Sequence, residues 1–123
     1  MRAVLIAMGV TLAAAGAARA EGDPAKGKTV FSKCMACHNA DKDQNKVGPY
    51  LHGVVGRKAG SVAGFNYSDA MKNSGLTWDE ATLSSYLENP KAKVPGNKMA
   101  FPGLPKQEDR DNVIAYLKEQ GSK

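Results

Sequence analysis

The sequence is poor in cysteine and lacks the common motifs of nucleotide-binding folds. Two cysteines among 123 residues are too few for a disulfide-stapled mini-protein. There is no Walker loop, and no G-x-G-x-x-G lies between a strand and a helix. No segment alternates between apolar and polar residues as a strand does, which favours an all-α fold. The length fits one ordinary domain and is too short for most two-substrate enzymes.

Long apolar runs are also absent, except at the N-terminus. Arg2 precedes an apolar stretch that ends near Ala15, and Ala18-Arg19-Ala20 matches a signal-peptidase site. The stretch is shorter than the ~20 residues that a membrane-spanning helix needs. We therefore predict that residues 1–20 are a cleaved signal peptide and that residues 21–123 form one soluble, exported domain.

The charge of that domain excludes nucleic acid as the expected partner. Residues 21–123 contain 15 basic and 12 acidic residues, a formal charge of +3, and 13 of the basic residues are lysines. Lysine suits weak, steerable encounters better than bidentate phosphate recognition. Basic and aromatic residues do not interleave as in single-strand nucleic-acid platforms. An acidic protein surface is the better candidate.

Helix signals are separated by long irregular stretches. Residues 39–64 and 91–105 are rich in Gly, Pro and polar residues, so we expect both to be irregular. So much loop leaves a thin core, which another group should fill. The expected helices run from the Asp23-Pro24 cap to about residue 37, from Ser68 to Asn73 before Gly75, from the capping box Thr77–Glu80 to Pro90, and through Val113–Gln120 to Gly121.

Residues 34–38 indicate what fills the core. Cys34-Met35-Ala36-Cys37-His38 is the C-x-x-C-H arrangement of a c-type haem attachment. Cysteines three residues apart on a helical turn share one face, so both can add to the vinyl groups of one porphyrin. The adjacent imidazole then serves as an axial ligand of the iron. The motif predicts one haem c, bound through Cys34 and Cys37, with His38 on the metal.

Three other uses of the cysteines are weaker. A dithiol redox pair belongs near a β-α-β pattern, which the sequence lacks. Zinc could use both cysteines with His38 and His52, but adjacent Cys and His fit one tetrahedron poorly. A disulfide across three residues would be strained.

Four side chains are candidates for the sixth ligand of the iron. Met35 lies between the two cysteines and cannot reach the opposite face. His52 lies in a Gly-flanked turn, and Met71 sits at a helical position that is typical of core packing. Met99 lies in the irregular stretch 95–103, which can place its backbone against a porphyrin, so Met99 is favoured.

A series of short stretches accompanies the C-x-x-C-H motif along the chain. With them, the chain from Gly27 to Gly121 resembles class I c-type cytochromes of the short cytochrome c2 and mitochondrial type. The resemblance implies the cytochrome c fold, in which short helices and loops wrap one haem and the terminal helices cross at Gly27, near Tyr116. The stretches are Val47–Pro49, Leu51–Gly53, Gly56–Lys58, Gly64–Ala70, Leu76–Trp78, Tyr86–Pro90 and Lys98–Phe101.

The same resemblance implies roles for individual residues. Met71 and Asn97 depart from the family pattern, which usually has Asn and Thr at these positions; a drier haem pocket is the hypothesis for Met71. Asn97 can still donate to a haem propionate. The other implied roles are Met99 as distal ligand, the Pro49 carbonyl as acceptor from His38, Arg57, Tyr67 and Trp78 around one propionate, and Tyr86 as donor to the Met99 sulfur.

The function implied by the resemblance is electron transfer rather than catalysis. Together with the export signal, it suggests a bacterial, periplasmic, monomeric carrier of single electrons. Its partners would be a bc1-type complex, a terminal oxidase, a reaction centre or a dehydrogenase, met through acidic docking surfaces. The alternative, a peroxidase or gas-ligand sensor, requires an open sixth site. The lysines expected around the haem edge are Lys33, Lys46, Lys91, Lys98 and Lys106.

Overall fold

The computed structural model describes residues 22–123, so the signal peptide expected at residues 1–20 lies outside the described part. Within that part there is no strand, and the one β-bridge, between Lys58 and Thr77, is isolated. The all-α prediction is confirmed. The helices are α1 (Pro24–Phe31), α2 (Asp69–Lys72), α3 (Glu80–Glu88), α4 (Pro90–Lys93) and α5 (Gln107–Gly121).

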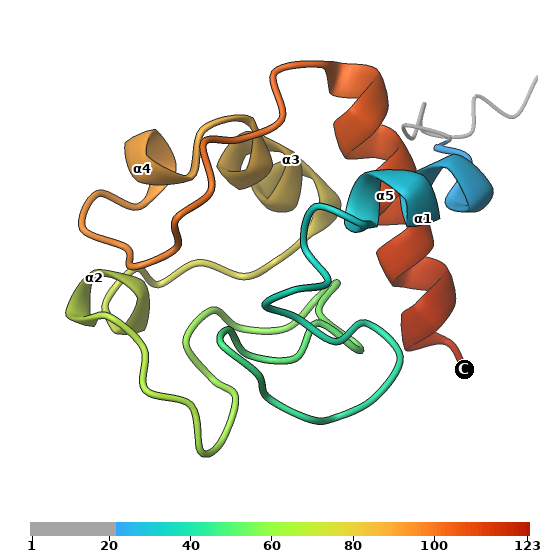
Figure 1. Ribbon diagram of the computed structural model, residues 1–123. Helices are drawn as coiled ribbons and strands as arrows, with labels where there is room; N and C mark the ends of the chain where they lie inside the picture. The colour runs from blue at the N-terminus through green and yellow to red at the C-terminus, as the bar shows by residue number, and fades with distance from the viewer. Residues whose placement is uncertain (1–21) are drawn as a thin grey trace, which may run out of the picture.

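Helices α1 and α5 cross with their backbones in contact (Figure 1). A Cβ atom on Gly27 would collide with the Asn112 carbonyl and the Tyr116 Cβ atom, so only glycine permits this approach. The Asn112 side chain also accepts a hydrogen bond of 2.8 Å from the Asp23 N–H. Beside this contact the rings of Phe31 and Tyr116 lie 5.4 Å apart. The crossing expected at Gly27 is therefore present.

Helix α1 is shorter than the sequence pattern predicts. Its start agrees with the prediction, because Asp23 caps the Ala25 N–H and Pro24 occupies the first turn. It ends at Phe31 rather than near residue 37, and tight turns follow it. The helical spacing of apolar residues continues through these turns, so the sequence pattern predicted too long a helix.

The boundaries of α3 and α4 also correct the sequence prediction. Thr77 pairs with Lys58 in the bridge, so Asp79 rather than Thr77 caps α3, by accepting from the Thr82 N–H. Helix α3 ends at Glu88, just before Pro90. Pro90 itself starts α4, since its fixed φ suits the first helical position. The expectation that 91–105 is wholly irregular is thus wrong for residues 91–93.

Helix α5 ends at Gly121, where the sequence predicted its end. Gly121 has no positive φ, and Ser122 is the C-cap. No helix in residues 22–123 has the length and apolar character to cross a membrane.

The core lies between α3, α5 and the loops that fill the lower half of Figure 1. Trp78 and Tyr86 pack against each other in this core, with ring centroids 4.9 Å apart and ring planes tilted by 51°. Several half-buried sulfur-containing and apolar side chains pack against it and bring the N-terminal turns, the middle loop and the stretch before α5 to one place. Among these are Cys34, Leu51, Met71, Leu76, Met99 and Phe101.

Candidate functional site

Cys34, Cys37 and His38 project from one tight turn that follows α1. The N–H groups of Cys37 and His38 both donate to the Cys34 carbonyl, at 3.0 and 2.9 Å. Both cysteines are half-buried free thiols, so no disulfide competes for their sulfur atoms. Burial raises the pKa of Cys34, the Cys37 thiol raises it further, and Lys33 lowers it. At neutral pH the Cys34 sulfur is therefore a protonated thiol facing an apolar interior.

The imidazole of His38 is fixed in orientation and protonation. Its Nδ1 atom lies 2.7 Å from the Pro49 carbonyl oxygen, which can only accept, so Nδ1 carries the proton and Nε2 keeps a lone pair. Burial lowers the pKa of His38, and the hydrogen bond to Pro49 raises it in part. The positive charges of Arg57 and Lys46 lower it further. The structure thus presents a neutral imidazole with Nε2 suited to a metal.

Gly48 leaves room for that imidazole because it has no side chain. The sequence pattern alone did not assign Gly48 a role. A Cβ atom at Gly48 would collide with the His38 ring, and the Gly48 N–H donates to the Cys37 carbonyl at 2.7 Å. Its position just before Pro49 was the only local signal. The glycine brings the loop back onto the turn that carries both cysteines.

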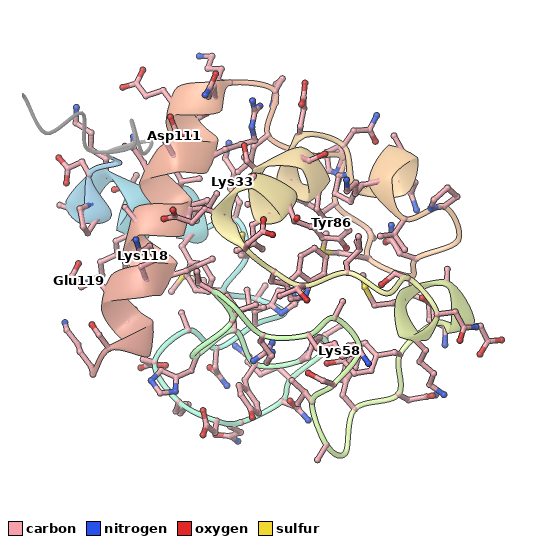
Figure 2. The ribbon with its side chains drawn as sticks, turned by 180° about the vertical axis from the view of Figure 1, so that it is seen from behind. Lys33, Lys58, Tyr86, Asp111, Lys118 and Glu119 are labelled. Carbon is pink, nitrogen blue, oxygen red and sulfur yellow. The ribbon has the colours of Figure 1, made fainter. Side chains whose placement is uncertain are left out.

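Met99 lies beside the buried phenol of Tyr86. The Tyr86 hydroxyl is 4.0 Å from the Met99 sulfur, and Figure 2 shows the Tyr86 ring in the interior, between α3 and the loops. Burial raises the pKa of Tyr86 to about 12, so the phenol stays protonated and can donate at neutral pH. The Met99 N–H donates to the Asn97 side-chain oxygen at 2.9 Å.

The side chain of Asn97 bonds to the backbone around it. Its amide nitrogen donates to the carbonyls of Pro90 and Val94, both at 2.9 Å, and the side chain is buried. These two bonds use both amide hydrogens, and the propionate contact implied by the resemblance stays a prediction. Asn97 instead links the end of α4 to the backbone of Met99.

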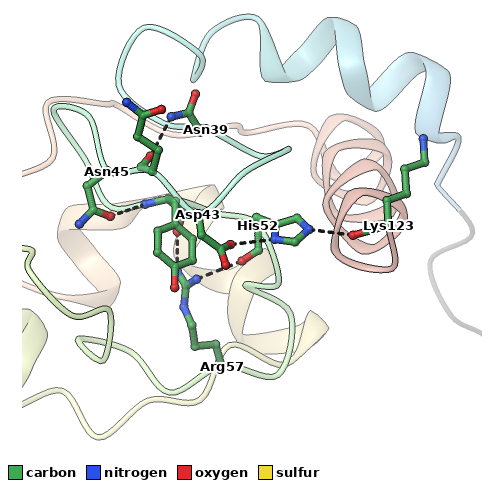
Figure 3. A network of polar contacts seen from close by, with 8 residues as sticks. Asn39, Asp43, Asn45, His52, Arg57 and Lys123 are labelled. Carbon is green, nitrogen blue, oxygen red and sulfur yellow. Dashed lines mark hydrogen bonds and ion pairs between the residues drawn. The ribbon is translucent and has the colours of Figure 1, made fainter.

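The backbones of Arg57 and Trp78 meet beside the bridge between Lys58 and Thr77. The backbone N–H of Trp78 donates to the Arg57 carbonyl at 2.8 Å. The Arg57 guanidinium donates to the Tyr50 carbonyl at 2.8 Å and lies over the Tyr50 ring (Figure 3). The Tyr67 hydroxyl accepts from the Val62 N–H at 3.1 Å. The side chains of Arg57 and Tyr67 are thus engaged within the middle loops, and Arg57 is half-buried.

His52 lies apart from the cysteines. Its Nδ1 atom is 2.8 Å from Asp43 and its Nε2 atom 3.3 Å from the Lys123 carbonyl, as Figure 3 shows. Both ring nitrogens are therefore engaged elsewhere. In residues 22–123 no group of three or more His, Cys, Asp or Glu side chains is arranged to hold a metal ion. His52 is therefore not placed to serve as the fourth ligand of a zinc ion with Cys34, Cys37 and His38.

The residues that converge here fit a haem c. Two free thiols and the Nε2 lone pair of His38 come from one turn, and the thioether of Met99 comes from a distant segment that packs on the same core. Met71 is half-buried against that core, whereas Met35 is 54% exposed. Of the candidate sixth ligands, Met99 alone has a hydrogen-bond donor placed at its sulfur in the described structure.

The family model for cytochrome c matches residues 24–121 of the chain. The chain belongs to the cytochrome c family. It is 58% identical to cytochrome c2 of Rhodomicrobium vannielii over 122 residues, covering 98% of each chain. It is 59% identical to cytochrome c2 of Rhodoblastus acidophilus over 106 residues, covering 83% of this chain and 99% of the other.

A solved structure agrees with this assignment. Cytochrome cH from Methylobacterium extorquens matches with a TM-score of 0.75 and 55% identity, covering 80% of this chain and 99% of that one. The predicted cytochrome c fold is confirmed. The chain is a class I c-type cytochrome of the cytochrome c2 type, which binds one haem c covalently and carries electrons rather than catalysing a reaction.

Proposed function

We propose that this chain is a periplasmic cytochrome whose haem iron is held by His38 and Met99 and which passes single electrons between redox proteins. The observation that carries the ligand pair is the position of Met99, with Tyr86 at its sulfur and Asn97 at its backbone N–H. Haem c, when bound, supplies an iron that gains and loses one electron.

The protein side chains define what that iron can do. His38 and Met99 together leave no coordination position for a substrate, which favours electron transfer over peroxidase or sensor chemistry. The thioether of Met99 and the apolar surroundings both favour the reduced iron. Tyr86, protonated at neutral pH, supports the sulfur without adding a charge.

The absorption spectrum of the purified, exported protein tests the ligand pair. We expect a sharp ferrous c-type spectrum and, in the ferric protein, the weak far-red band of sulfur-to-iron charge transfer. Haem without that band would overturn Met99 ligation and favour an open or replaced sixth position. N-terminal sequencing of the protein from the periplasm should start at Glu21; a chain that still begins at Met1 would contradict export by cleavage.

The proposed docking surface surrounds the turn that carries the cysteines. Met35 and Val47, 54% and 76% exposed, are the large apolar side chains that remain exposed in residues 22–123. Lys46, which precedes Val47 in the chain, donates from its ammonium to the Met35 carbonyl at 2.7 Å. Apolar contacts with a cationic rim suit an acidic partner surface. The rim comprises the exposed lysines Lys33, Lys46, Lys91, Lys98 and Lys106.

Ionic strength tests this surface. The rate of electron transfer to a bc1-type complex, terminal oxidase, reaction centre or dehydrogenase should fall as salt is added, because exposed charges are screened. Lys33→Gln should weaken the salt dependence, and Lys26→Gln, an exposed lysine of α1, should not. A salt-independent rate, or equal effects of both variants, would contradict the lysine rim.

A further inference from the structure

Arg110 is a buried cation in the first turn of α5. Its side chain is 8% exposed, although arginine is rarely buried without partners. The first turn of a helix disfavours positive charge, and the other charged residues of this turn, Glu108 and Asp109, are acidic as expected. The position therefore costs stability that its contacts must offset.

The contacts of Arg110 reach two other parts of the chain. Nη1 donates to the carbonyls of Leu104 and Pro105, at 2.7 and 2.9 Å. Nε donates to the Ser84 hydroxyl of α3 at 3.1 Å. All three acceptors are uncharged, so the guanidinium serves to hold oxygen atoms in place rather than to neutralise a carboxylate.

Leu104 and Pro105 end the segment that carries Met99. This segment has no helix between Val94 and Lys106 and passes over α3 on its way to α5 (Figure 1). The Leu104 N–H donates to the Leu87 carbonyl of α3 at 2.6 Å, while its carbonyl accepts from Arg110. The backbone of Leu104 is thus held from both sides, five residues after Met99.

We propose that Arg110 is a positioning residue for Met99. Asn97 anchors the start of the segment and Arg110 anchors its end, so that the sulfur between them keeps one position. The role in ligation rests on the proposed function of Met99; the role in ordering the segment does not. Loss of the Arg110 contacts frees the end of the segment and weakens the hold of Met99 on the iron.

Two variants and one control test the proposal on the haem-loaded protein. Arg110→Lys keeps the charge but loses the planar fork that reaches several oxygens, and Arg110→Gln keeps a donor without the charge, so that at least one is expected to fold. Ser84→Ala removes only the contact with α3 and leaves the contacts with Leu104 and Pro105. Amide hydrogen exchange and the pH at which the far-red band disappears are measured for each protein.

We expect exchange at Met99 and Leu104 to become about tenfold faster in the Arg110 variants, with a smaller change at Val30 of α1. The far-red band should disappear at a lower pH, and Ser84→Ala should change neither measurement. Equal acceleration at Val30, Met99 and Leu104, or an equal effect of Ser84→Ala, would show a merely structural residue and overturn the proposal. If the unmodified protein lacks the band while exchange still rises at Met99 and Leu104, Met99 ligation fails but the ordering role of Arg110 stands.

Discussion

The segments that carry His38 and Met99 are held by different kinds of contact. Around His38, backbone groups bond to one another across the turn, and the imidazole donates to a carbonyl only eleven residues away. Around Met99, side chains do this work: Asn97 holds the start of the segment and Arg110 its end. The first arrangement is mainly local, whereas the second depends on the helices around it.

The two segments should therefore differ in which substitutions disturb them. The turn at residues 34–38 survives most changes elsewhere, because its bonds close within a few residues. The Met99 segment depends more on two side chains, Asn97 and Arg110, and should respond to the loss of either one.

Replacing both Cys34 and Cys37 with Ser should abolish covalent haem attachment. Neither serine hydroxyl can form the thioether bonds that hold the porphyrin. Haem staining of the chain after a denaturing gel measures the attachment. Met35→Ala, in the same turn, is the matched control and should stain normally. Staining of the double variant would mean that haem is attached elsewhere.

Met99→Ala should leave haem attached and remove the far-red band completely. Loss of the thioether should also lower the reduction potential by something on the order of 0.1 V, within the ~0.8 V that axial ligands span. Spectroscopy and potentiometric titration measure both effects. Met71→Leu keeps an apolar side chain of similar size against the core and should retain the band. If instead Met71→Leu loses it, the two methionines have been assigned the wrong way round.

Asn97→Ala should lower the free energy of unfolding by about 3 kcal/mol and weaken the band. The change leaves the Pro90 and Val94 carbonyls without their donor in a buried place, and the Met99 N–H without its acceptor. Asn45→Ala is the comparison, since Asn45 also bridges two segments but lies away from Met99. It should cost about 1 kcal/mol and leave the band intact. Denaturant unfolding and the spectrum decide between a local and a general effect.

His52→Gln should have the smallest effect, confined to pH-dependent stability. The hydrogen bond with Asp43 raises the pKa of His52, and the Lys123 contact raises it further. A raised pKa in the folded state stabilises the protein fully below the unfolded value of about 6.5, and this contribution is lost as pH rises through the folded pKa. Because the pair is exposed, the contribution should stay below about 1 kcal/mol.

Denaturant unfolding at pH 5.5 and 8.5 measures that contribution as a difference between the two proteins, so the titration of His38 cancels. The unmodified protein should gain stability over the variant only at the lower pH. The same gain at pH 8.5 would show that His52 acts through packing rather than through its charge.

The parts of the molecule that local sequence determines could be predicted. The Asp23-Pro24 start of α1 and the turn with both cysteines follow from contacts within a few residues. The start of α3 was misplaced because Thr77 pairs with Lys58, which no helix pattern reveals. Helix α4 was not predicted because Asn89 is both the C-cap of α3 and the N-cap of α4, so no loop separates the two helices.

Contacts between distant residues could not be predicted. Asn97 bonds to Pro90 and Val94 where α4 forms, and the sequence pattern did not predict α4. The burial of Arg110 follows from Ser84, 26 residues away, and from the path of the chain before α5. Such roles depend on the folded arrangement, so a sequence pattern alone does not show them.

The joint between α1 and α5 has a consequence for how the chain can vary. The Asp23–Asn112 bond closes a loop of 89 residues. The entropy of closing a loop grows only with the logarithm of its length, so ten additional residues would raise the closure cost by about 0.1 kcal/mol. An insertion at the exposed residues 41–44 also lengthens the 11-residue loop that the His38–Pro49 bond closes, where ten additional residues would cost about 0.6 kcal/mol. New partner contacts can therefore be added there at a modest cost while the helix joint stays the same.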